Sequence, residues 1–264
     1  MPITVFTSNQ PRHLRLVELL AEITDEVYVV QGANTLFPGD EPGFFKKSAT
    51  MKSYFRRVMD AEKEIFGMPR FSPSNARHLV MRSGDVNKLN MDTFSPILES
   101  EYIVVFAATW IRPPLIDALI AQKAVNIHMG TSPWYRGSSC NFWALHDNRP
   151  DLVGATIHML SSGLDNGSVL FHALPDTQPA DPFVLGMKAV RSALISITER
   201  IGDGTLFDVP PVSQDSSQEI RYTRNADFTD AVAAAYLKRA MSPDAVGDAL
   251  ENRDLGMFVR PLVH

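Results

Sequence analysis

The sequence predicts an α/β fold in which a mostly parallel sheet is flanked by helices and followed by a small C-terminal appendage. The first observation is a strand–loop–helix–strand order at the start of the chain, which is typical of parallel sheets. The second is a set of strand-length apolar runs without polar alternation, as expected for strands covered on both faces. The third is the polar, turn-rich stretch 202–219, which indicates a boundary. We therefore expect a main domain over 1–201 and a small strand and helix region over 202–264.

The first unit of this fold covers residues 2–31. A short apolar run at 2–7 precedes a polar loop at 8–13, apolar residues at helical spacing cover 14–21, and 26–31 has the composition of a buried strand. The loop has no GxGxxG pattern, so we infer no dinucleotide cofactor. Its polar residues either contact a substrate or form a polar loop with the N-cap of the helix, and the sequence leaves both readings open.

A helix rich in basic residues is predicted next. Residues 50–66 contain no Gly or Pro, and their apolar side chains recur at helical spacing. The basic side chains in and before this helix are Lys46, Lys47, Lys52, Arg56, Arg57 and Lys63. They form either a solvated helix face or a set of phosphate contacts to an anionic substrate.

The remaining elements follow from apolar runs and breakers. We expect strands at 79–81, 102–106, 124–127, 156–160, 169–174 and 220–224. Helices are expected around 96–98 and at 115–122, 141–145, 181–200 and 227–239. The last stretch, 241–264, adds little to this prediction.

Composition restricts the class of protein. A hydrophobic content of 45% and a charged content of 21% are ordinary for a soluble globular chain. No apolar run approaches the roughly 20 residues of a membrane helix, and the N-terminus does not resemble a signal peptide. The single cysteine, Cys140, fits a reducing compartment, so we expect a cytoplasmic protein. No Cys/His cluster has zinc spacing, and the net charge of −5 argues against a nucleic-acid partner.

Three polar residues of the central segment suggest a site. Asn126 and His128 lie two apart at the end of a predicted strand, so their side chains face the same side. Asp165 lies in a loop containing Gly163 and Gly167, whose backbone can approach a ligand closely. The strand predicted at 156–160 would return the chain so that the carboxylate meets the imidazole.

These residues stand in three ordered segments: Asn-x-His, then Ser-Pro-x-Tyr-Arg-Gly, then Gly-x-Thr-Ile-His followed by Gly-Leu-Asp-x-Gly. The pattern resembles the folate-dependent formyltransferases, most clearly from about residue 85 to 175. The resemblance implies a Rossmann-like formyltransferase fold over 1–201, an N10-formyltetrahydrofolate co-substrate and no metal. It also implies a catalytic triad of Asn126, His128 and Asp165.

The resemblance further assigns binding residues. It implies folate contacts from the loop after strand 102–106 and from the Asp165 loop, namely Trp110, Ile111, Arg112, Ser161, Ser162, Gly163 and Leu164. Trp110 can alternatively cap the core. Substrate contacts are expected from Asn9, Gln10, Arg12, Tyr135 and Arg136. We interpret His158 as a hydrogen-bonded sheet histidine and Cys140 as a packing residue.

The acceptor is the amine that would receive the formyl group. The divergent stretch 32–82 and Met129-Gly130 resemble most the sugar-nucleotide N-formyltransferases of surface polysaccharide (O-antigen and lipopolysaccharide) synthesis. The alternatives are N-hydroxyornithine, glycinamide ribonucleotide, methionyl-tRNA, or an inactive folate-binding protein. We expect a small-molecule partner, a nucleoside-diphosphate amino sugar, and neither a nucleic acid nor a membrane as partner. The sequence leaves open whether the protein forms a homodimer.

Overall fold

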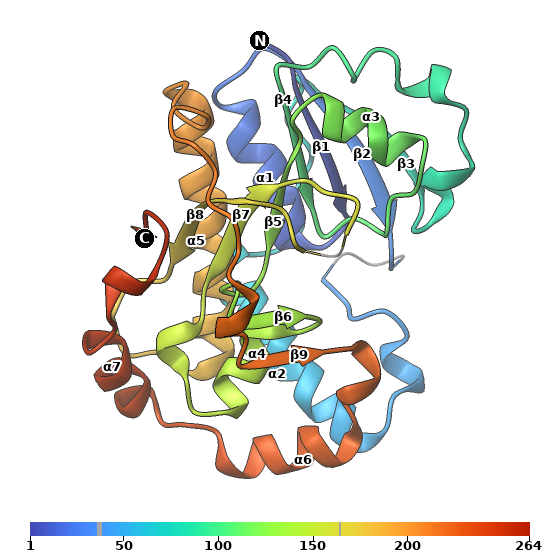
Figure 1. Cartoon of the computed structure of the whole chain (residues 1–264). Helices are drawn as coiled ribbons and strands as arrows, with labels where there is room; N and C mark the ends of the chain where they lie inside the picture. The colour runs from blue at the N-terminus through green and yellow to red at the C-terminus, as the bar shows by residue number, and fades with distance from the viewer. Residues whose placement is uncertain (36–38, 164) are drawn as a thin grey trace.

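A computed structural model of the chain describes residues 1–35, 39–163 and 165–264, and an eight-stranded sheet forms its centre (Figure 1). The strand order is β10-β8-β7-β5-β4-β1-β2-β3. The strands are β1 (Ile3–Ser8), β2 (Val27–Ala33), β3 (Ala76–Arg82), β4 (Tyr102–Phe106), β5 (Val125–His128), β7 (Ala155–Met159), β8 (Val169–Leu174) and β10 (Leu262–Val263). The five strands from β3 to β5 are parallel, whereas β7 is antiparallel to β5 and β8. The predicted mostly parallel sheet is therefore confirmed.

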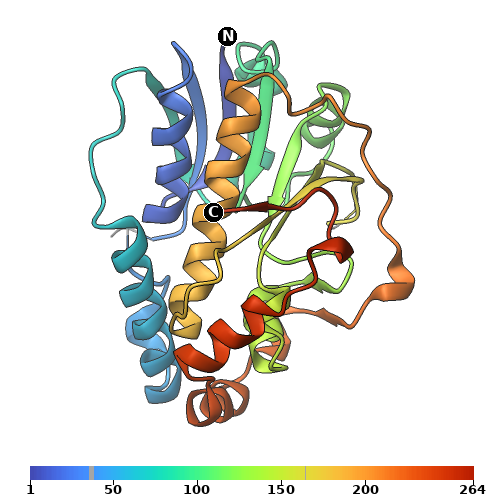
Figure 2. The same ribbon diagram turned by 90° about the vertical axis from the view of Figure 1, so that its left-hand side faces the viewer.

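Helices cover both faces of the sheet. On one face lie α1 (Pro11–Ala21), α2 (Ala49–Phe66) and the long α5 (Pro182–Gly202), with α1 and α5 side by side in Figure 2. On the other face lie α3 (Leu115–Ala121) and the short 3₁₀ turns Asp85–Lys88 and Met91–Phe94.

Strand β4 shows why both faces must be covered. Val104 and Phe106 belong to the core beneath α1 and α5, whereas Ile103 and Val105 belong to the core beneath α3. Because successive side chains of a strand point to opposite faces, a strand buried on both sides needs an unbroken apolar run. That run made strand 102–106 predictable from the sequence.

The C-terminal region is built into the rest of the molecule. The short strand β9 (Arg221–Thr223) pairs with β6 (Tyr135–Gly137), and β10 forms one edge of the main sheet. The helices α4 (Cys140–His146), α6 (Asp230–Arg239) and α7 (Pro243–Glu251) surround the lower end in Figure 1. The region predicted as an appendage thus completes the sheet and supports the segment after β5.

Several local expectations were wrong. Residues 96–98 form turns rather than a helix. Pro96 has no N–H to donate, and the N–H groups of Ile97 and Leu98 both donate to the same carbonyl oxygen, that of Phe94. The segment 241–264, which added little to the prediction, contains α7 and β10. The strand formed by Tyr135 to Gly137, which pairs with β9, was not predicted. Among the described residues, no helix combines the length and the hydropathy needed to cross a membrane.

Candidate functional site

The site begins at β5, which lies between the parallel neighbour β4 and the antiparallel neighbour β7. Val125 and Ile127 face the core beneath α5, so Asn126 and His128 face the opposite side of the sheet. The antiparallel register places Asn126 directly opposite His158 of β7. Three polar side chains from two strands are therefore gathered on one face of the sheet.

The loop after β7 brings Asp165 back over these side chains. Its Oδ2 atom lies 3.2 Å from Nδ1 of His128, and its Oδ1 atom accepts a hydrogen bond of 3.4 Å from Asn126. Asp165 has a φ of 47°, a left-handed conformation that Asp tolerates better than most residues. Gly167 lies so close to β7 that an added Cβ atom would come within 2 Å of the Met159 carbonyl oxygen. The structure thus brings the three predicted catalytic residues together.

His158 is a fourth member of the cluster. Its Nδ1 atom lies 2.9 Å from the Met159 carbonyl oxygen, so that nitrogen carries the proton and Nε2 accepts a 3.0 Å hydrogen bond from Asn126. Nε2 also lies 3.8 Å from Asp165. The sequence placed His158 on a strand, but its contact with Asn126 depends on a cross-strand register that the pattern did not show.

The charges of His128 and Asp165 support each other. Burial disfavours the imidazolium, but the contact with the Cys140 sulfur and the hydrogen bond that Nδ1 donates to the Asp165 carboxylate raise the pKa of His128 to about 10. Burial also opposes the carboxylate of Asp165, yet the hydrogen bond and the positive charge of His128 bring its pKa well below its usual range. The pair is accordingly an imidazolium and a carboxylate near neutral pH.

Cys140 occupies the other side of the imidazole. Its sulfur lies 3.4 Å from Nε2 of His128, and its side chain is 1% exposed. A Cβ atom added at Gly130 would lie 2.4 Å from Cβ of Cys140 and 2.9 Å from Nε2 of His128, so only glycine fits there. The expected packing role describes the burial of Cys140 but missed its contact with the imidazole of His128.

A pocket of about 270 Å³ opens in front of Asn126 and Asp165. We call it the Trp110 pocket; its lining includes Trp110, Ile111, Ser161, Ser162, Gly163 and His158. Trp110 is 52% exposed and therefore forms a rim rather than a core cap. Arg112 does not line this pocket; its backbone N–H donates to the side chain of Asn87. Leu164, also expected here, lies outside the described residues.

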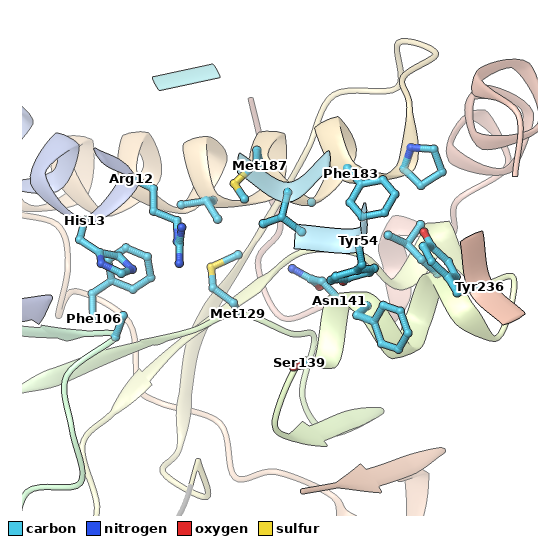
Figure 3. A pocket seen from close by; sticks show the side chains of 17 residues that line it. Arg12, His13, Tyr54, Phe106, Met129, Ser139, Asn141, Phe183, Met187 and Tyr236 are labelled. Carbon is cyan, nitrogen blue, oxygen red and sulfur yellow. The ribbon is translucent and has the colours of Figure 1, made fainter. Parts of the chain in front are cut away.

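A second pocket of about 320 Å³ lies on the other side of the carboxyl ends of β4 and β5 (Figure 3). We call it the Tyr54 pocket, since its widest wall is aromatic and consists of Tyr54, Phe142, Phe183 and Tyr236. Figure 3 shows Met129 between this aromatic end and the end formed by His13 and Phe106. Tyr236 belongs to α6, so the C-terminal region supplies part of the wall.

The two pockets meet at consecutive residues. After β4, Ala107 lines the Tyr54 pocket and Ala108 lines the Trp110 pocket. At the end of β5, Met129 lines the Tyr54 pocket and Asn126 lines the Trp110 pocket, with His128 between them in the chain. A reaction between two bound molecules can therefore take place at the end of β5, where open α/β sheets bind ligands.

The residues expected to contact the substrate lie in different places. Arg12 lines the Tyr54 pocket, where its guanidinium pairs with the buried carboxylate of Glu62 at 2.8 Å. Asn9 and Gln10 are buried and hold the following loop: Asn9 bonds the backbone of Asn34 and Thr35, and Gln10 bonds that of Gly39 and Asp40.

Tyr135 and Arg136 line neither pocket. Tyr135 is 1% exposed and its hydroxyl donates to Asp147, while Arg136 pairs with Glu219 at 3.1 Å. These contacts hold the β6–β9 ribbon in place. The structure therefore does not bring these two residues to the acid–base cluster, although the motif that contains them surrounds it.

Fold and site together define an α/β protein with a partly buried Asn–His–Asp cluster between two pockets. Among the described residues, no group of His, Cys, Asp and Glu side chains is arranged to hold a metal ion. No protein-family model matches the chain.

Comparison with curated proteins finds methionyl-tRNA formyltransferases. The enzyme of Desulforamulus reducens is 31% identical over 84 residues, 32% of this chain and 26% of that protein. The enzyme of a Synechococcus species is 27% identical over 128 residues, 46% of this chain and 38% of that protein. The chain thus spans well under half the length of the curated relatives it matches.

Solved structures with the same fold are also formyltransferases. A sugar N-formyltransferase from a Shewanella species has a TM-score of 0.51 and 17% identity, covering 100% of this chain and 92% of that one. A 4-N formyltransferase from Francisella tularensis has a TM-score of 0.51 and 15% identity, covering 93% and 85%. The N-formyltransferase of Helicobacter canadensis, solved with folinic acid and dTDP-3-aminofucose, has a TM-score of 0.51 and 13% identity, covering 100% and 85%. The chain has the formyltransferase fold, as the sequence resemblance predicted.

Proposed function

We propose that the protein transfers a formyl group from N10-formyltetrahydrofolate to the primary amine of a small substrate. The observation that carries the proposal is the Asn126–His128–Asp165 cluster, held at the junction of two separate pockets. A transfer between two molecules needs both reactants beside the same acid–base group.

The donor belongs in the Trp110 pocket. Its exposed indole offers a flat face, and Ile111 and Ile116 add apolar surface, which suits a pterin ring. Asn126 and Asp165 line the same pocket, so a formyl group held there lies beside the cluster. The Helicobacter canadensis enzyme of the same fold was solved with folinic acid, a formylated folate.

The chemistry follows from which groups face the pocket. When the amine attacks the formyl carbon, negative charge develops on the formyl oxygen, and the amide NH2 of Asn126 can donate to it by giving up its long 3.4 Å bond to Asp165. One such donor is typically worth about 3 kcal/mol of barrier. The attacking nitrogen becomes positive, and the carboxylate of Asp165 accepts its proton and passes it to the departing folate nitrogen.

His128 acts from behind these two groups. Both of its ring nitrogens already face partners, Asp165 on one side and Cys140 on the other, and the side chain is 7% exposed. Its positive charge stabilises the negative charge that develops in front of it and holds Asp165 in place. A direct hydrogen bond from His128 to the formyl oxygen would require Nε2 to leave Cys140.

The acceptor belongs in the Tyr54 pocket. In the described part of the chain, the hydroxyls of Tyr54 and Tyr236 have no hydrogen-bond partner, so both can bond a ligand. Aromatic rings beside free hydroxyls, with Ser139 and Asn141 nearby, suit a sugar, which has apolar C–H faces and several hydroxyls. We therefore propose a nucleotide-linked amino sugar, and hence a role in surface polysaccharide synthesis.

The basic residues left unpaired in the described part of the chain favour a position for the acceptor's diphosphate outside the aromatic end of the Tyr54 pocket. The one cation among the lining residues of the Tyr54 pocket, Arg12, is already paired with Glu62. Of the basic residues on and before α2, Lys47 pairs with Glu41 and Arg57 with Asp181. Lys46, Lys52 and Arg56 remain as candidate phosphate contacts near the N-terminal half of α2.

A single assay tests the proposal. The full chain is incubated with N10-formyltetrahydrofolate and a panel containing amino-sugar nucleotides, free amino sugars, N-hydroxyornithine, glycinamide ribonucleotide and methionyl-tRNA. Tetrahydrofolate release is followed optically, and the product is identified by mass spectrometry. We expect formylation of an amino-sugar nucleotide. Efficient formylation of glycinamide ribonucleotide or methionyl-tRNA with inert sugars would contradict the acceptor, and folate binding without any turnover would contradict the reaction.

A further inference from the structure

The C-terminal region contacts the loop that carries Asp165. The side-chain amide of Gln214 donates two hydrogen bonds, one of 2.9 Å to the Asp165 carbonyl oxygen and one of 2.8 Å to the Gly167 carbonyl oxygen. These bonds span 49 and 47 residues of sequence. They place one side chain across the turn whose carboxylate meets His128.

The segment that carries Gln214 is itself held against the sheet. Val212 exchanges backbone hydrogen bonds of 2.7 and 2.8 Å with Val169 of β8. Arg260 donates to the carbonyl oxygens of Leu170 and Pro210, at 2.9 and 3.0 Å, and so ties the same segment to the same strand. Gln214 therefore extends from a fixed support, which a positioning residue requires.

The Asp165 loop needs such a support. Asp165 has a positive φ, a conformation that persists in a non-glycine residue only where its surroundings hold it. Within the loop, Ser161 bonds Asn166 and the carbonyl oxygen of Gly163, but these contacts lie inside the loop and do not tie it to the sheet. The Asp165 carboxylate contacts His128 and Asn126 of β5, and the two bonds from Gln214 add a connection through the loop backbone.

We propose that Gln214 is a positioning residue that holds the Asp165 loop in its active conformation, so that the C-terminal region governs the acid–base cluster. Gln214 touches neither pocket and acts through the backbone of Asp165 and Gly167. Its Oε1 atom is buried without a partner among the described residues, so the amide is oriented by its two donated bonds. The effect on turnover rests on the proposed formyl transfer, whereas the placement of Asp165 does not.

The test replaces the donor while keeping the volume. Gln214→Met retains the length of the side chain and removes both hydrogen bonds. The matched control is Gln218→Met, in the same segment, where the amide bonds only the exposed Asp215. The first readout is the titration of the His128 ring, followed by NMR of histidine-labelled protein. The second readout is kcat and KM for formyl transfer by the full chain.

We expect Gln214→Met to lower the titration midpoint of His128 by about one pH unit or more, because the carboxylate moves away. We expect kcat to fall roughly tenfold or more with a smaller change in KM for folate, because the pocket walls remain. Gln218→Met should change neither. A variant that matches the wild type in both readouts overturns the proposal.

Two further outcomes keep the test decisive. If Gln214→Met does not fold, Gln214→Asn is measured instead; its amide is one methylene shorter and cannot reach both carbonyls, so the same shifts are expected. If the wild type shows no turnover with any amine while the His128 titration still moves, the positioning role stands and the proposed function fails.

Discussion

Asp165 Oδ2 lies 3.2 Å from His128 Nδ1 because β7 runs antiparallel to β5 in a sheet whose other central strands are parallel. The reversal returns the chain along the face that carries Asn126 and His128. The loop after β7 then folds back over the same face. The antiparallel direction of β7 therefore brings His128 and Asp165 together.

Asp165→Asn tests the charge of this pair. The substitution keeps the shape of the side chain and removes the carboxylate, so we expect turnover to fall by roughly 10²-fold or more, the scale of acid–base contributions. Folate affinity, measured by fluorescence titration, should change little, because the Trp110 pocket relies on other side chains. Near-normal turnover across about pH 6 to 9 would remove Asp165 from the mechanism.

His128→Asn provides the companion measurement. We expect a loss of turnover similar to that of Asp165→Asn. The double variant should be less than additively worse, because residues that act as one unit lose their joint function once. Full additivity of the two losses would mean that His128 and Asp165 act independently, against the contact between them.

The pH dependence of folding stability follows from the same pair. The folded-state pKa of His128, about 10, lies above its ordinary value of 6.5. Its contribution to stability is therefore complete below about pH 6.5 and is lost as the pH rises toward about 10. Asp165 has the opposite sign: its lowered pKa gives stability that is lost in acid.

We expect the urea midpoint of the wild type to decline as the pH rises through this upper range. His128→Asn should flatten that decline, since the titrating group is gone. An unchanged slope in His128→Asn would assign the decline to other groups.

How far the sequence predicted the fold depended on the length of each element. The strands predicted at 102–106 and 169–174 agree with β4 and β8, because mostly apolar segments of this length favour a buried strand. Strand β10 has two residues and no pattern of its own; it forms because Leu262 and Val263 find an open edge of β8. The helix α7 was missed although Ser242 before Pro243 is an N-cap signal, and its side chain accepts from Ala245.

The site was predicted only where the motif named residues. Asn126, His128 and Asp165 came together as the resemblance implied. Tyr135 and Arg136 did not, because a motif gives the identity of a residue but not the direction of its side chain. Gln214 left no signal, since a side chain that bonds backbone carbonyls has no required partner in the sequence.

Trp110→Ala tests the donor pocket. Loss of the exposed ring should weaken folate binding roughly five- to tenfold, the scale of one aromatic contact, and leave the KM of the acceptor nearly unchanged. The control is Phe71→Ala, which removes a fully exposed aromatic ring that lines neither pocket. Equal folate affinity in wild type and Trp110→Ala would mean that the indole does not contact folate and has a structural role only.

Cys140→Ala tests whether the thiol beside His128 is a nucleophile. The sulfur is buried and lines neither pocket, so we expect turnover to fall by less than about tenfold, through loss of its contact with Nε2. Loss of a true nucleophile costs about 10⁴-fold or more. A loss of that size in a folded variant, together with mass-spectrometric trapping of formylated wild-type protein, would replace direct transfer by a covalent route.

Tyr236→Phe tests the acceptor pocket and the place of the C-terminal region in it. The substitution keeps the ring that packs against Tyr54, Phe142 and Phe183 and removes only the hydroxyl. If that hydroxyl bonds the acceptor, the KM of the amine should rise roughly two- to tenfold, the value of one hydrogen bond, with kcat and folate affinity unchanged.

Tyr222→Phe on β9 is the control for this substitution, because its side chain is exposed and lines neither pocket. Steady-state kinetics with each substrate varied in turn separates the outcomes. A rise in the folate KM alone would mean that folate binds in the Tyr54 pocket and the acceptor in the Trp110 pocket. No change in either KM would place the acceptor outside the Tyr54 pocket and leave the hydroxyl of Tyr236 without a part in binding.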